Sequence, residues 1–213
     1  MPVSLRLFLS TEFDSPLSLN GDFSNYDNGI YNGSDGENQV EQMWVANLQT
    51  DLARDLSVDG TAVFTTDLLY GPGDILALSE SEAVLILGYV YDGGDTGYQV
   101  IRGFVGTTAE DHTTSSSVIA AYDYTNAIIK GFDTDTSAGD EADWLRVSAV
   151  YYDPDASEWD STNTKELVIP ELAYNDYFTF YRNIRVPSGQ GAYYKTDLRW
   201  RVEATRFVHD FSS

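Results

Sequence analysis

Two runs of alternating apolar and polar residues lie near the C-terminal end of the chain. In the first run, one set of alternate positions holds Phe178, Phe180, Arg182, Ile184 and Val186. In the second run, the corresponding set holds Leu198, Trp200, Val202 and Ala204. Alternation with a period of two places one face of a strand in a core and the other in water. Turn-forming residues separate the runs at 187–191 (PSGQG), so we predict two adjacent antiparallel strands of a β-sandwich.

Short apolar runs continue along the rest of the chain, and turn residues rich in Gly, Asn and Asp lie between them. They predict strands at residues 3–9, 40–48, 54–58, 61–66, 83–91, 97–105, 118–124, 127–132, 144–152 and 165–169. Asp59 and Gly60 predict a hairpin between residues 54–58 and 61–66. Residues 83–91 (AVLILGYVY) are apolar almost throughout, which predicts a strand buried on both faces.

This pattern is typical of an all-β protein. We predict an antiparallel β-sandwich, immunoglobulin-like or jelly-roll-like, with long loops rich in Gly, Asp and Asn. The absence of a linker predicts one domain over residues 1–213, with about 71–140 as a candidate inserted lobe.

The most informative property of the composition is its large excess of acidic residues. The chain has 23 Asp and 11 Glu against nine Arg and three Lys, and its net charge is −22. Abundant Asp with little Lys is typical of halophilic proteins, because concentrated salt screens the repulsion among the acids. We therefore expect a high-salt source, and an ordinary acidic extracellular protein is the alternative. Nucleic acid is not an expected partner, since its phosphates would be repelled.

Neither disulfides nor a membrane anchor is expected. The chain has no Cys, which excludes thiolate metal sites and a Cys nucleophile. The longest apolar stretch, residues 83–91, is too short to span a bilayer. Arg6 interrupts the apolar run at the N-terminus, so no secretory signal is expected.

The sequence shows no catalytic signature. His112 and His209 are far apart in the sequence, no nucleophile elbow accompanies them, and we expect both to be solvated on the surface. With 34 acidic residues, chance pairs of carboxylates are expected, so no pair marks a glycosidase. We expect a protein without enzymatic activity and without an organic cofactor.

Two acidic loops are candidates for calcium binding. Oxygen donors alternate at Asp133, Asp135 and Ser137, and again at Asp153, Asp155 and Ser157. Ca²⁺ prefers such carboxylate oxygens, although neither loop completes the EF-hand pattern. The four aspartates are therefore either metal ligands or members of solvated acidic loops.

Tyrosines crowd the C-terminal runs at positions 177, 181, 193 and 194. Tyrosine is enriched at protein interfaces, but it is equally normal on the outer face of a sandwich strand. Both interpretations stay open.

The C-terminal segments FTFYRNIRVPSGQ (178–190) and DLRWRVEA (197–204) resemble the last strands of β-sandwich virion proteins of tailed viruses. That family's pattern is an aromatic strand, Arg-x-x-Val-Pro, Gly and an alternating strand. This chain departs in its spacing, with three residues between Arg182 and Val186. The early segments SPLSL (15–19) and VEQMWVANL (40–48) are also similar to that family, whereas the middle of the chain is not.

The resemblance and the composition together imply a structural protein of a tailed virus that infects a halophilic archaeon. It implies a capsid decoration, turret, tail or baseplate component that contacts other virion proteins as a homo-oligomer. Such a protein would be assembled in the host cytoplasm and released in the virion into high salt. The alternative is a secreted or cell-surface β-sandwich module that binds carbohydrate or calcium.

Overall fold

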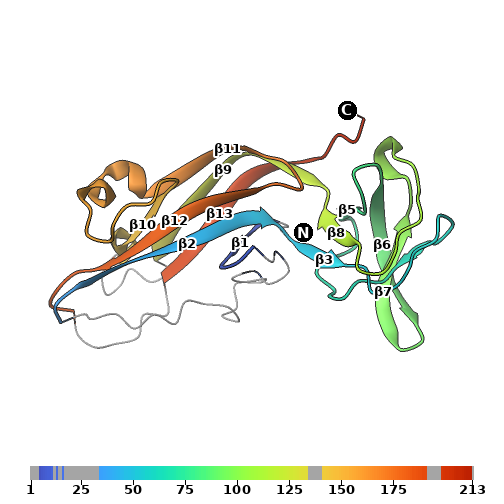
Figure 1. The fold of residues 1–213 in the computed structure, drawn as a ribbon, viewed down its shortest axis with the longest axis horizontal. Coiled ribbons are helices and arrows are strands. Elements are labelled where there is room, and N and C mark those ends of the chain that lie inside the picture. Colours follow the sequence, from blue (N-terminus) through green and yellow to red (C-terminus); the bar gives the residue numbers. More distant parts are fainter. Residues whose placement is uncertain are drawn as a thin grey trace.

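The computed structural model describes residues 5–11, 13, 16, 34–133, 141–190 and 198–212. Its strands form three antiparallel sheets (Figure 1). The helical turns of the described residues are four short 3₁₀ segments: η1 (Phe104–Gly106), η3 (Glu141–Trp144), η4 (Ser157–Asp160) and η5 (Thr162–Thr164). Within these ranges no helix has the length and hydropathy needed to cross a bilayer. The prediction of an all-β protein with antiparallel sheets is confirmed.

Two of the sheets form a sandwich. The first contains, in spatial order, β1 (Leu5–Phe8), β2 (Glu37–Asn47), β12 (Tyr177–Val186) and β10 (Leu145–Ser148). The second contains β11 (Glu166–Leu172), β9 (Tyr122–Asp133) and β13 (Leu198–Val208). Apolar side chains of both sheets, such as Val45, Phe180 and Ile129, are fully buried in one core. The predicted sandwich is therefore present, and its immunoglobulin-like or jelly-roll-like type stays a prediction.

The third sheet has six strands and closes on itself. Its order is β3 (Gln49–Asp51), β8 (Ser117–Ala120), β5 (Ile75–Ala77), β6 (Ala83–Asp92), β7 (Asp95–Ile101) and β4 (Ala62–Val63). A bridge between Leu52 and Thr65 joins the two ends of this order. Backbone hydrogen bonds from Ala53 to Phe64 (2.8 Å) and from Thr66 to Asp51 (2.9 Å) flank the bridge. Closure leaves few unpaired strand edges on which other chains could pair.

The six-stranded sheet is inserted between two strands of the sandwich. Its strands run from Gln49 to Ala120, and β2 and β9 of the sandwich precede and follow them. Figure 1 shows the sandwich at one end of an elongated molecule and the six-stranded sheet at the other. Residues 122–133, the last part of the range expected for an inserted lobe, belong to the sandwich.

A buried polar cluster joins the two parts. The Asn47 side chain donates to the carbonyls of Tyr122 and Tyr174, both at 2.9 Å, and accepts from the Tyr124 hydroxyl at 2.8 Å. The Tyr70 hydroxyl of the six-stranded part donates to the carbonyl of Leu48 at 2.7 Å. One apolar cluster continues through this junction from the sandwich into the six-stranded sheet.

The prediction that the two C-terminal runs form adjacent strands is wrong. β12 pairs with β2 and β10 in the first sheet, whereas β13 pairs with β9 in the second. After β12 the chain passes from one sheet of the sandwich to the other. The alternating pattern would be the same whether β13 lay beside β12 or in the opposite sheet. On the predicted inward face of β12, Phe180, Arg182 and Ile184 are buried and Phe178 and Val186 are half-buried, but Asn183 on the opposite face is buried as well.

Two further expectations are corrected. Residues 54–58 and 61–66 do not form a hairpin, since Leu56 bridges His112 and Ala62–Val63 pairs with β7. The apolar run 83–91 is buried only at its beginning, because β5 pairs with residues 83–85 and then ends. The second half of β6 has β7 as its paired strand and is largely exposed.

Candidate functional site

The exposed half of β6 and its partner β7 form what we call the tyrosine hairpin. Leu87, Tyr89 and Tyr91 occupy alternate positions of β6 and are 54%, 50% and 78% exposed. The hairpin turns at Gly93 and Gly94, both with positive φ. Figure 1 shows the green hairpin extending below the rest of the six-stranded sheet. Large exposed apolar side chains grouped on one strand make this hairpin a candidate interaction surface.

Salt bridges hold the tip of the hairpin. The Arg54 guanidinium donates to Asp92 at 2.8 Å and also pairs with Asp95, the two residues that flank the turn. Its carbon Cζ lies 4.1 Å from the centre of the Phe64 ring. Arg54 therefore ties the turn to the body of the six-stranded sheet.

Aromatic rings connect the exposed hairpin with the core. Tyr98, which is opposite Tyr89 in register, is fully buried, and the two ring centres are 5.9 Å apart. The Tyr89 hydroxyl donates to the Tyr70 carbonyl at 3.3 Å, and the Tyr98 hydroxyl accepts from the Tyr70 amide at 3.1 Å. Burial raises the pKa of Tyr70 and of Tyr98, so both phenols stay neutral near pH 7. The exposed tyrosines are thus supported by a neutral, hydrogen-bonded cluster.

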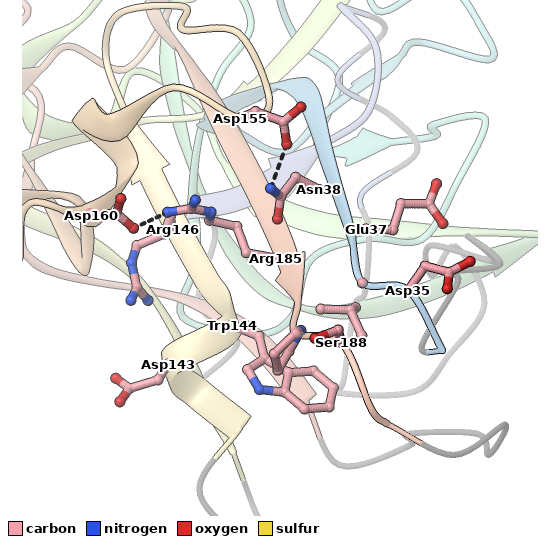
Figure 2. A pocket seen from close by; sticks show the side chains of 13 residues that line it. Asp35, Glu37, Asn38, Asp143, Trp144, Arg146, Asp155, Asp160, Arg185 and Ser188 are labelled. Carbon is pink, nitrogen blue, oxygen red and sulfur yellow. Dashed lines mark hydrogen bonds and ion pairs between the residues drawn. The ribbon is translucent and has the colours of Figure 1, made fainter.

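An open cleft lies at the far end of the sandwich (Figure 2). Its volume is about 560 Å³, and its lining comes from residues 35–38, 143, 144, 146, 155, 160 and 185–188. The lining includes five carboxylates, two guanidinium groups and the indole of Trp144. The acids are Asp35, Glu37, Asp143, Asp155 and Asp160, and the cations are Arg146 and Arg185. Their arrangement depends on the ends of β2, β10 and β12 meeting at one edge.

Several polar groups of the cleft are fixed by bonds to one another. Asn38 donates to Asp155 at 2.7 Å, and Arg185 pairs with Asp160. Arg146 donates to the carbonyls of Trp159 (3.1 Å) and Leu145 (2.9 Å). Burial lowers the pKa of Arg146, although nearby Asp143 and Asp160 oppose this, and the group stays charged.

A second cluster of ionisable side chains is buried inside the six-stranded part. The Glu82 carboxylate is fully buried and pairs with Arg102, which donates two hydrogen bonds to it, one of them at 2.8 Å. It also accepts from the Glu110 amide at 2.8 Å and lies 2.9 Å from the His112 ring. Burial alone would raise the pKa of Glu82, but these hydrogen bonds together outweigh it and hold the pKa below its usual range. The cluster joins the turn before β6 to the loop after β7, which is a structural role.

The expectation that both histidines are solvated is wrong. His112 is buried in the Glu82 cluster, where its ring faces the carboxylate. His209 is partly buried, its Nδ1 lies 2.9 Å from Asp123, and its ring contacts Tyr174 at a centre distance of 4.3 Å. Both partners are distant in sequence, so the local pattern could not identify them.

Calcium binding by the two acidic loops stays a prediction. Asp133 accepts from the Glu141 amide at 3.1 Å, and Asp155 accepts from Asn38. Asp153 has its backbone carbonyl bonded to the Trp159 indole at 3.0 Å, and Asp135 lies outside the described residues. No group of three or more His, Asp or Glu side chains suited to a metal occurs among the described residues.

Of the four C-terminal tyrosines named from the sequence, the structure describes two, and one of these is exposed. Tyr177 is exposed and contacts Phe13, whereas Tyr181 is half-buried against Tyr151. Tyr193 and Tyr194 lie outside the described residues. Sequence reasoning missed the more exposed pair, Tyr89 and Tyr91, because the surrounding run is apolar enough to suggest burial.

Comparison of the chain with family models, with curated proteins and with solved structures finds no match.

Proposed function

We propose that the protein is a non-enzymatic structural component of a particle, and that its tyrosine hairpin contacts further copies of the same chain. The observation that carries this proposal is the exposure of Leu87, Tyr89 and Tyr91 on strands held by Arg54 and by a buried tyrosine cluster. Tyrosine offers a large amphipathic contact area with few rotatable bonds. A surface already held in place loses little entropy on binding, which favours a specific contact.

Charge sets the conditions for such a contact. Each copy carries a net charge of −22, so copies repel one another in dilute buffer. At about 1 M salt the Debye length falls to about 3 Å, and an apolar contact can then dominate. Association in high salt agrees with the high-salt source expected from the composition.

We further propose that the particle is the virion of a tailed virus of a halophilic archaeon. The resemblance of residues 178–190 and 197–204 to β-sandwich virion proteins supports this part of the proposal, together with the acidic composition. In that setting the protein serves in capsid decoration, a turret, the tail or the baseplate. Closed symmetric rings of identical subunits are the usual form of such assemblies.

The test is the mass of the purified protein in solution, measured by light scattering after size exclusion from low salt to about 3 M KCl. We expect a discrete oligomer at high salt. Tyr91→Ser should weaken association about tenfold or more, because truncating a central aromatic contact costs at least about 1.4 kcal/mol. Tyr151→Ser is the matched control, since Tyr151 is 53% exposed on the sandwich and outside the hairpin.

The melting temperatures of both variants show whether they fold like the wild type. An oligomer that Tyr91→Ser weakens and Tyr151→Ser leaves unchanged supports the proposal. A wild-type monomer at every salt concentration, or an oligomer that neither variant affects, overturns the hairpin contact.

A further inference from the structure

The open cleft at the end of the sandwich is large enough to hold a small molecule. Its volume of about 560 Å³ lies within the usual range of roughly 300–1,000 Å³ for small-molecule pockets. Four separate segments contribute to its lining. Two pairs of residues lie opposite each other on neighbouring strands at this edge. Asn38 lies opposite Arg185, and Arg146 lies opposite Asn183.

Trp144 supplies an apolar surface among these charges. It is half-buried at the end of η3, and Figure 2 shows its ring beside the chain at Ser188. Its indole N–H makes no hydrogen bond within the part of the chain that the structure describes. A half-exposed indole with a free donor can stack on a flat apolar face and donate to a hydroxyl at the edge of that face.

The polar groups around Trp144 are fixed but have bonding capacity left. Asp155 accepts from Asn38 through one oxygen, and Asp160 pairs with Arg185 through one oxygen, so each carboxylate retains further lone pairs. Arg146 is held through Nε and Nη1, which leaves Nη2 as a donor. Donors and acceptors therefore alternate around the aromatic ring.

A buried amide lies beneath this arrangement. Asn183 is 0% exposed, and its Nδ2 donates to the Pro154 carbonyl at 2.9 Å. Its Oδ1 has no hydrogen-bond partner among the described residues. Asn183 lies on the same face of β12 as Arg185 and opposite Arg146, both of which line the cleft. Asn183 is not part of the lining of the cleft, and its buried amide fixes β12 beneath the cleft through the bond to Pro154.

The charges select among ligand classes. Five carboxylates against two guanidinium groups give the lining an acidic excess, which opposes an anion. A small metal ion would need several oxygens in one group, which the described residues do not form. A sugar ring is neutral, has apolar C–H faces for an indole, and has hydroxyls that both donate and accept.

We propose that this cleft binds a neutral saccharide, with Trp144 as the stacking platform and Asp155, Asp160 and Arg146 as hydroxyl partners. The cleft is separate from the tyrosine hairpin. The proposal of saccharide binding therefore does not depend on whether the chain assembles with further copies. It adds glycan recognition to a protein proposed as structural.

The test is a titration of the whole protein in about 3 M KCl with glucose, galactose, mannose, N-acetylglucosamine and their trisaccharides, followed by calorimetry and tryptophan fluorescence. We expect at least one of these sugars to bind. Trp144→Ala should weaken binding tenfold or more, and Trp144→Phe should retain part of it because a ring remains. Asp155→Ala should also weaken binding, and Tyr91→Ala, on the distant hairpin, should leave it unchanged.

Choline and arginine are the competing probes, and melting curves confirm that each variant folds. Failure of every sugar to bind overturns the proposal. Binding of choline or arginine without any sugar assigns the cleft to organic cations instead. Sugar binding that survives both Trp144→Ala and Asp155→Ala places the ligand elsewhere and also overturns it.

Discussion

Glu82→Gln is the substitution that most sharply tests how the six-stranded part is held together. Gln keeps the shape of the side chain but removes its charge. The side chain of Glu82 is 0% exposed and that of its partner Arg102 is 8% exposed. The variant therefore buries a guanidinium beside a neutral amide, while Arg102 keeps its bonds to the carbonyls of Ser57 (2.9 Å) and Gly60 (3.1 Å).

The expected loss is large compared with the stability of a domain. Removing one partner of a buried ion pair typically costs about 3–5 kcal/mol, because the remaining charge is left uncompensated. Domains of ordinary stability unfold with about 5–15 kcal/mol, so the variant should lose a third or more of its stability. Glu82→Gln combined with Arg102→Met should be less destabilised than the sum of the two single variants, since no charge then remains buried.

Urea unfolding at constant high salt measures these differences, and its pH dependence gives a second check. The pKa of Glu82 is lowered in the folded state, so its stabilisation is fully present near pH 7. It is lost as the pH falls through the folded-state pKa, because the unfolded carboxyl takes up a proton first. The stability gap between the wild type and Glu82→Gln should therefore narrow below about pH 4.

Asp143→Asn is the matched control. Asp143 pairs with Lys165 at 2.6 Å, but the two side chains are 68% and 51% exposed. Exposed pairs contribute at most about 1 kcal/mol, and less in high salt. A cost for Glu82→Gln that is no larger than that of Asp143→Asn, or a gap that does not change with pH, would refute the account of this cluster.

Two further substitutions test the junction and the packing of the sandwich. Asn47→Ala removes its hydrogen bonds to two buried carbonyls and from the Tyr124 hydroxyl, so urea unfolding should show a loss of about 2–4 kcal/mol. A loss below about 1 kcal/mol would show that the junction does not depend on this side chain. Gly131→Ala should cost about 1–3 kcal/mol in the same assay, since the new Cβ would lie within 3.0 Å of the Leu145 side chain. Gly88→Ala, whose Cβ would meet nothing within 4 Å, should be nearly neutral, and equal costs for the two glycines would contradict the packing argument.

The local pattern predicted strands well because alternation is a property of single strands. Phe180, Arg182 and Ile184 on β12 are buried as the alternation predicted, although Asn183 on the opposite face is buried too. The same pattern does not say which strand lies beside it, because each sheet of a sandwich offers an equivalent buried face. The placement of β12 and β13 in different sheets therefore had to come from the structure.

The candidate sites could not be predicted for a related reason. The exposure of Tyr89 and Tyr91 depends on where β5 ends, and nothing in the run 83–91 marks that point. The cleft brings Trp144 together with residues from both ends of the chain, and His112 meets Glu82 across thirty positions. Contacts over such separations leave no local signal, so composition suggested solvated acids and histidines instead.

The most direct test of the central claim is photo-cross-linking from the hairpin. A benzophenone amino acid replaces Tyr91, with the same substitution of Tyr151 as the control, and the protein is irradiated in about 3 M KCl. The account predicts covalent dimers of this chain from position 91 and few from position 151. Monomers alone from position 91, in protein that melts like the wild type, would contradict the claim that the tyrosine hairpin joins the copies.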